Sequence, residues 1–117
     1  MRILLFSFFL TLSSVAVAQD ATLGKGLFQE CAACHSTKPG EVMLGPSLAG
    51  VYGRKAGSVE GFRYTNALKK SGVVWGEETL DVYIADPQAA IPGGRMPYSG
   101  MAKPEDRKNL IAFLQTL

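Results

Sequence analysis

The chain holds all of its cysteine and histidine in one short stretch, Cys31-Ala32-Ala33-Cys34-His35. Two cysteines at this spacing lie one helical turn apart, so both thiols can form thioether bonds to the two vinyl groups of one haem. The histidine that follows is then placed directly beneath the iron, where it acts as the proximal ligand. The stretch therefore predicts one covalent haem c, attached through Cys31 and Cys34 and ligated by His35.

Three other chemistries use cysteines at this spacing. A structural zinc site takes four Cys or His ligands in two pairs, and the sequence has no second pair. A disulfide between Cys31 and Cys34 closes too short a loop to add much stability. A thioredoxin-like redox motif follows a strand, and no strand pattern flanks this motif. Haem attachment is the favoured interpretation, and thiol redox chemistry is the main alternative.

Residues 1–18 have the pattern of a secretory signal peptide. Arg2 precedes an apolar run over 3–10, and small residues lead to Ala16-Val17-Ala18. We expect a signal peptide at 1–18 and one domain at 19–117, exported to the periplasm. An uncleaved anchor is the alternative, but the apolar run is barely long enough to span a bilayer.

The exported domain is small and nearly neutral. Removal of residues 1–18 from the 117 leaves 99, and a chain of this size buries only about two thirds of its unfolded surface. We therefore expect the haem to complete the core and the haem-free protein to fold poorly. The formal charge falls from +2 to +1 with the loss of Arg2, and no basic run suggests nucleic acid as a partner.

Apolar periodicity predicts an all-α fold with helices at both ends of the domain. The expected helices cover about 21–33, one or two turns over 65–70, a stretch from Glu77 that stops before Pro87, and a last helix that Pro104 opens.

The connecting segments are rich in glycine and proline. The density of glycine over 45–61 predicts a compact loop without strand pairing, and 91–97 must be irregular.

The function depends on what fills the iron site opposite His35. An open site binds gases or peroxide, whereas a methionine thioether closes it and favours electron transfer. The domain offers Met43, Met96 and Met101. Met43 is too near His35 in sequence to reach the far face easily, so Met96, in a Pro/Gly loop, is favoured over Met101.

Taken together, these residues resemble a class I cytochrome c, most nearly the small soluble bacterial members. The resemblance covers nearly all of 20–117. Its motifs are Gly24-x-x-x-Phe28, Cys31-x-x-Cys34-His35, Gly45-Pro46-x-Leu48, Gly53-Arg54, Gly61-Phe62-x-Tyr64-Thr65, Gly72-x-x-Trp75, Leu80-x-x-Tyr83, Ile91-Pro92-Gly93-x-x-Met96 and Leu110-Ile111-Ala112-Phe113-Leu114.

The resemblance implies a class I cytochrome c fold, in which the first and last helices cross at Gly24 and short helices and loops wrap one haem. It implies a monomeric one-electron carrier with His35 and Met96 as axial ligands, and no enzymatic activity. Transient redox partners, a reductase or dehydrogenase as donor and an oxidase or other acceptor, would dock near the haem edge. No stable insertion into a membrane is expected.

The resemblance also assigns roles to other residues around the haem. The carbonyl of Pro46 would accept the His35 Nδ1–H, and the Tyr83 hydroxyl would approach the ligating sulfur. Tyr98 would cover the exposed haem edge. The positions that match donors around the propionates are Arg54, Tyr64, Thr65 and Trp75.

Two departures from the mitochondrial members stand out. Leu68 and Gly94 replace two of three polar residues that hold a buried water near the iron, so we expect a drier pocket. Mitochondrial members have a ring of lysines around the haem edge, and several of these positions are not basic here. Electrostatic attraction of acidic redox partners should therefore be weaker than in those members. Those positions are Glu30, Gln88, Ala89 and Ala102, which leave Arg95 and Lys103.

Two other functions remain open on the sequence. A haem-based sensor or ligand-binding protein would release its methionine to admit a small ligand. A dedicated cytochrome subunit would serve one dehydrogenase. Carbon monoxide binding to the reduced protein separates the first from a carrier, and cell fractionation separates the second.

Overall fold

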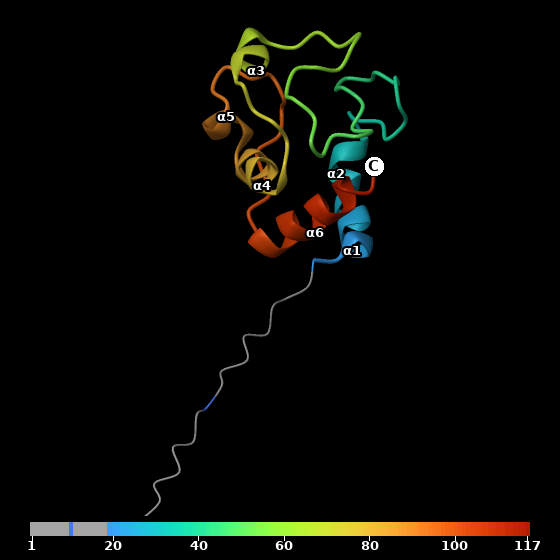
Figure 1. The fold of residues 1–117 in the computed structure, drawn as a ribbon, viewed down its shortest axis with the longest axis vertical. Helices are drawn as coiled ribbons and strands as arrows, with labels where there is room; N and C mark the ends of the chain where they lie inside the picture. The colour runs from blue at the N-terminus through green and yellow to red at the C-terminus, as the bar shows by residue number, and fades with distance from the viewer. Residues whose placement is uncertain (1–9, 11–18) are drawn as a thin grey trace, which may run out of the picture.

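The helices nearest the two ends of the domain pack across one another. In the computed structural model, which describes residue 10 and residues 19–117, α1 spans Ala21–Leu27 and α6 spans Pro104–Leu114. They cross closely at the base of the fold (Figure 1). A Cβ on Gly24 would lie 1.9 Å from the carbonyl oxygen of Asn109, so only glycine permits this approach. The predicted crossing of the first and last helices is confirmed.

Local capping explains where α1 begins. The Asp20 carboxylate accepts hydrogen bonds from the backbone N–H groups of Thr22 (2.8 Å) and Leu23 (3.2 Å). A turn at Phe28 separates α1 from α2 (Gln29–Ala32), which continues toward His35. The Phe28 and Phe113 rings lie 5.2 Å apart, which ties this end of α1 to α6. The helix expected over 21–33 is therefore present as two consecutive pieces.

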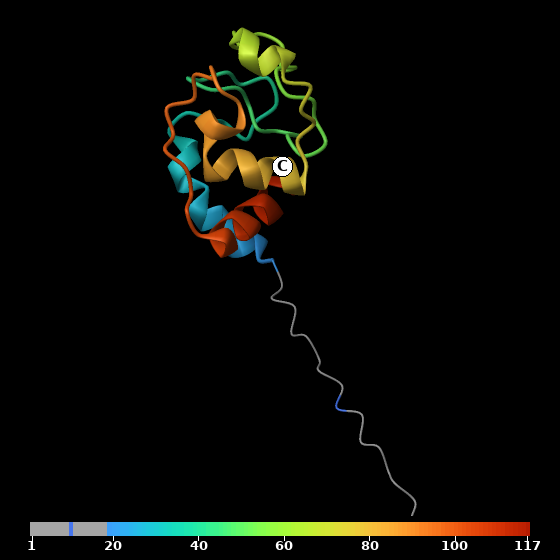
Figure 2. The same ribbon diagram turned by 90° about the vertical axis from the view of Figure 1, so that its left-hand side faces the viewer.

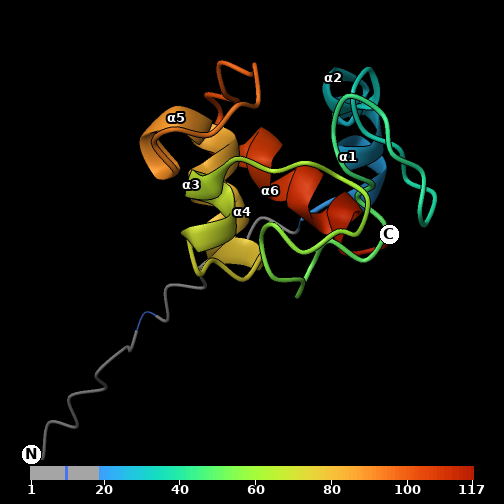
Figure 3. The same ribbon diagram turned by 90° about the horizontal axis from the view of Figure 1, so that it is seen from above.

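Three further helices lie on the other side of α6 (Figure 3). They are α3 (Asn66–Lys70), α4 (Glu77–Ala85) and α5 (Pro87–Ala90). The predicted helices over 65–70 and from Glu77 are confirmed. The short α5 was not predicted: Pro87 ends α4 but also occupies the first position of α5, whose Ala89 N–H is capped by Asp86 Oδ1 at 3.1 Å.

The glycine-rich loop corrects one prediction. We expected no strand pairing over 45–61, yet Lys55 and Val74 form an isolated antiparallel bridge. The Trp75 N–H donates to the carbonyl of Arg54 at 2.9 Å, and the Ala56 N–H donates to that of Val73 at 2.8 Å. Residues 54–56 run beside 73–75, with turns before and after Lys55. The many glycines of this loop therefore did not prevent these few residues from pairing with another segment.

The hydrophobic core joins these helices and loops. Its most buried members in the described chain are Phe28, Val51, Ala56, Trp75, Leu80, Ile84, Ile91, Met101, Leu110, Ile111 and Leu114. Helices α4 and α6 contribute to it directly, and loops cover the remaining sides (Figure 2). The described part of the chain contains no helix with the length and apolar character needed to cross a bilayer. The expected signal peptide lies outside the described residues, apart from Leu10.

Candidate functional site

The end of α2 brings both thiols and the imidazole into a single turn. The N–H groups of Cys34 and His35 both donate to the carbonyl of Cys31, at 3.1 and 3.0 Å. Neither thiol is in a disulfide. Burial, with smaller contributions from the charges of Glu30 and Cys34, raises the pKa of Cys31 to about 11. The thiol is therefore neutral at physiological pH, unlike the reactive thiolate of a redox motif.

His35 is held in one orientation by the backbone. Its Nδ1 lies 2.7 Å from the carbonyl oxygen of Pro46, which can only accept, so Nδ1 carries the proton and Nε2 keeps its lone pair. Burial lowers the pKa of His35; the bond to Pro46 opposes this effect, and the charge of Arg54 adds to it. The ring is thus kept neutral, the form in which imidazole ligates a metal.

Gly45 leaves the space that the His35 ring occupies. A Cβ at this buried position would lie 2.4 Å from His35 Cε1. The Gly45 N–H donates to the carbonyl of Cys34 at 2.8 Å, which folds the chain back over the ring. The resemblance gave Pro46 a role beside His35, but it did not predict the contact between Gly45 and the ring, because that contact depends on tertiary folding.

The side chain of Arg54 is built into the loop that carries Pro46. Its guanidinium donates to the carbonyl oxygens of Ala49 (2.8 Å) and Ser47 (3.0 Å). Burial lowers the pKa of Arg54, and the proximity of Tyr64 partly offsets this effect. The structure thus places Arg54 close enough to influence both Tyr64 and His35 electrostatically.

The other residues expected near the propionates lie around this loop. Tyr64 accepts a hydrogen bond from the Val59 N–H at 3.1 Å, and Thr65 caps α3 by accepting from the Leu68 N–H at 3.3 Å. Trp75 is buried and its ring lies 4.8 Å from that of Tyr83. Burial raises the pKa of Tyr83, so its hydroxyl stays protonated.

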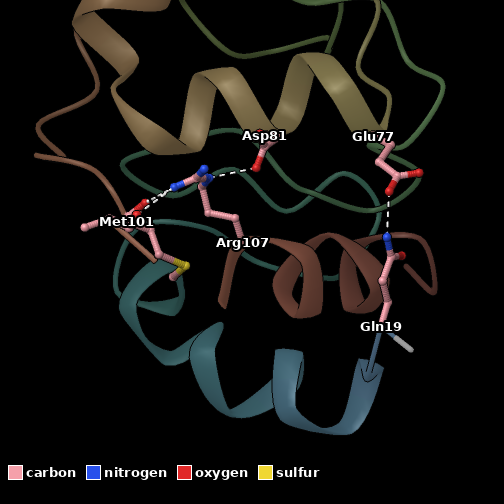
Figure 4. A network of polar contacts seen from close by, with 6 residues as sticks. Gln19, Glu77, Asp81, Met101 and Arg107 are labelled. Carbon is pink, nitrogen blue, oxygen red and sulfur yellow. Dashed lines mark hydrogen bonds and ion pairs between the residues drawn. The ribbon is translucent and has the colours of Figure 1, made fainter. Parts of the chain in front are cut away.

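The three methionines of the domain have different environments. Met43 is 43% exposed, Met101 is 6% exposed in the core, and Met96 is half-buried in the segment between α5 and α6. Figure 4 shows why Met101 is fixed: Arg107 donates to its carbonyl oxygen at 2.9 Å and pairs with Asp81 at 2.7 Å.

Tyr98 lies two residues after Met96, in the same segment, and it contacts α2. Its hydroxyl donates to Glu30 Oε2 at 2.6 Å. Partial burial, this bond and the charge of Glu30 all raise the pKa of Tyr98. Sequence reasoning named both residues but did not pair them, because their side chains meet only in the folded chain.

Comparison with known proteins decides the family. The model of the cytochrome c family matches residues 21–117. The chain belongs to the cytochrome c family. It is 50% identical over 98 residues to cytochrome c2 iso-2 of Magnetospirillum molischianum, covering 84% of this chain and 98% of that protein. It is 43% identical over 118 residues to cytochrome c2 of Blastochloris viridis, covering 98% of this chain and 93% of that protein.

A solved structure agrees with this assignment. Cytochrome cH from Methylobacterium extorquens superimposes with a TM-score of 0.79 at 38% identity, covering 84% of this chain and 99% of that one. The fold is therefore that of class I cytochromes c. This cytochrome c is an electron carrier, and it binds one haem c covalently through Cys31 and Cys34.

The chain's own residues fit this cofactor. Two thiols that form no disulfide precede an imidazole whose Nε2 remains available, and the absence of a side chain at Gly45 leaves room for the ring. Among residues 19–117, no three Cys, His, Asp or Glu side chains gather to hold a metal ion.

Proposed function

We propose that this cytochrome c is a periplasmic one-electron carrier in which His35 and Met96 are the two axial ligands. When bound, the haem supplies an iron that alternates between the ferrous and ferric states. The protein keeps both ligands in the same arrangement in the two states, so little rearranges on electron transfer. The observation that carries the proposal is the Pro46 carbonyl 2.7 Å from His35 Nδ1, which would leave Nε2 free to bind the iron and would raise the basicity of that ligand.

The environments of the methionines support Met96 as the second ligand. Met101 is packed in the core and its backbone is bonded to Ile84 and Arg107. Met43 lies at the surface, close to His35 in sequence. Met96 is half-buried in a segment that passes α3 and then descends to α6 (Figure 1). A thioether here closes the second axial site, so no iron position is left for a substrate and the protein has no catalytic activity of its own.

Redox partners would dock transiently at the face that carries Tyr98, through a small interface between monomers. The exposed residues that the resemblance assigns to this face are mixed in charge, since Glu30 is acidic and Arg95 and Lys103 are basic. The electrostatic attraction of a redox partner should therefore be weak, and the rate of association with that partner should depend only slightly on salt concentration. Residues 1–18 would direct export and be removed, and the mass of the mature N-terminus tests this.

An optical spectrum of the ferric and ferrous protein tests the ligands. We expect a c-type α-band, and the weak red band of methionine-ligated ferric iron that disappears in Met96→Ala. Met101→Leu and Met43→Leu, which conserve side-chain volume, are matched controls and should retain the red band. Persistence of the band in Met96→Ala would refute the ligation. A spectral shift of the reduced wild-type protein with carbon monoxide at neutral pH would instead indicate a ligand-binding function.

A further inference from the structure

The segment that carries Met96 is bonded firmly at both of its ends. Upstream, Arg95 donates to the carbonyl oxygen of Arg63 at 2.6 Å, and Gln88 donates to that of Gly94 at 2.7 Å. Downstream, the Met101 N–H donates to the carbonyl oxygen of Ile84 at 2.9 Å. These bonds join the segment to the 61–65 loop, to α5 and to α4.

Gly100 fixes the downstream end further. Its φ of +113° lies in a region that favours glycine, and a Cβ here would lie 2.1 Å from the carbonyl oxygen of Ala85. The backbone of the segment therefore lies directly on the end of α4. Between the two fixed ends, residues 96–99 form a short flap.

The flap has one side-chain bond to another element within the described chain. The Tyr98 hydroxyl donates to Glu30 Oε2 at 2.6 Å, whereas the Tyr98 N–H makes a local turn to the Met96 carbonyl at 2.9 Å. A length of 2.6 Å is typical of a hydrogen bond from a hydroxyl to a carboxylate. Such a bond is stronger than a hydrogen bond between two neutral groups. Pro97 and Ser99 are exposed.

Glu30, which accepts the hydrogen bond from Tyr98, lies in the helix that leads to the haem-attachment cysteines. Glu30 lies in α2, immediately before Cys31, and Tyr98 lies two residues after Met96. The bond thus joins the residue beside the first attachment cysteine to the flap that carries the methionine. Figure 2 shows the segment between α5 and α6 running past α2, as this contact requires.

We propose that the Tyr98–Glu30 hydrogen bond latches the flap 96–99 to α2, and that Glu30 is a positioning residue for the Met96 thioether. The proposal rests on Met96 being an axial ligand. Loss of the latch leaves both ends of the segment bonded and frees the residues between them. Met96 then leaves the iron more often, and a competing ligand finds the site open more of the time.

Imidazole binding to the ferric holoprotein measures this opening. We expect Tyr98→Phe and Glu30→Ala each to raise the apparent affinity for imidazole about five- to tenfold, the effect of losing one solvent-exposed hydrogen bond with a net contribution of about 1–1.4 kcal/mol. The double variant should gain no more than either single variant, since both remove the same bond. Tyr52→Phe, which removes a hydroxyl from an exposed tyrosine, is the matched control and should leave the affinity unchanged.

Amide hydrogen exchange gives a readout that does not depend on the ligand. The Tyr98 amide, bonded to the Met96 carbonyl, should exchange several-fold faster in Tyr98→Phe and Glu30→Ala, while the Met101 amide, bonded to Ile84, should keep its wild-type rate. Unchanged imidazole affinity and exchange in both variants, or additive effects in the double variant, would overturn the latch. Retention of the red band in Met96→Ala would overturn the ligation itself, so the two failures are distinguishable.

Discussion

The segment that carries His35 and the segment that carries Met96 are held by different kinds of contact. Residues 31–46 are fixed by bonds within the segment itself: Cys31 to His35, Cys34 to Gly45, and His35 to Pro46. Residues 91–103 are fixed by contacts to α2, α4, α5 and the 61–65 loop. The proposed ligand His35 is therefore positioned by local contacts, and the position of the proposed ligand Met96 depends on the whole fold. Changes near His35 should affect assembly, whereas changes near Met96 should affect ligation.

The largest effect should come from removing the covalent anchor. In Cys31→Ala combined with Cys34→Ala, no thioether can form, and we expect a haem-free protein with little helical signal in circular dichroism. A domain of this size buries too little surface of its own to fold stably. A cooperative thermal transition in the haem-free variant would contradict this expectation.

Gly45→Ala tests the local fixing of His35. The added Cβ would lie 2.4 Å from the His35 ring, so the ring must turn and weaken its bond to Pro46. We expect a loss of about 1–3 kcal/mol in the free energy of unfolding, measured with denaturant on the ferric holoprotein. Gly26→Ala is the matched control: nothing lies within 4 Å of a Cβ there, so it should be neutral or stabilise α1 by up to about 1 kcal/mol.

Gly100→Ala tests whether contacts with distant elements hold the segment that carries Met96. A side chain here meets the carbonyl of Ala85 and forces a backbone conformation with positive φ, at a cost of about 1–2 kcal/mol. Since this end of the segment lies beside the flap, we expect a weaker red band at neutral pH and an unchanged c-type α-band. Equal weakening of the red band in Gly45→Ala would remove the distinction between the two regions.

The smallest effect should come from the polarity of the pocket. Leu68 packs beside the hydrophobic core, at a position where the resemblance to mitochondrial members led us to expect a polar residue. Leu68→Asn supplies a partner for a buried water, which favours the charge of ferric iron. We expect the reduction potential to fall by roughly 40 mV, the equivalent of about 1 kcal/mol for one electron. Leu68→Met is the control, with similar volume and no donor, and a rise in potential with Asn would contradict the prediction.

The same contrast explains what the sequence could predict. The attachment motif and the four predicted helical stretches depend on neighbours in sequence, such as Asp20 capping α1 and Pro104 opening α6. The short α5 was missed because Pro87 both ends one helix and begins the next. The bridge between Lys55 and Val74 was missed because the glycine content of 45–61 does not tell which distant segment packs beside it.

At the site, the resemblance supplied the residues and the pairing of His35 with Pro46, but not the other contacts between side chains and distant parts of the chain. The positions of Tyr98 and Glu30 followed from the resemblance, but their hydrogen bond joins residues 68 apart in the chain. The fit of Gly45 to His35 and of Gly100 to Ala85 likewise depends on how distant backbones meet. Such contacts cannot be derived from spacing or periodicity.

The crossing of α1 and α6 has a consequence for the order of events during export. The helix that leads to Cys31 finds its main packing partner in the last helix of the domain, and the Asp20 N–H is bonded to Asn109 at 2.9 Å. A chain that emerges N-terminus first therefore exposes Cys31 and Cys34 before their supporting helix arrives. In the export proposed above, both cysteines are therefore accessible while the rest of the domain is still emerging. Haem attachment can then precede the packing of α6 on α1.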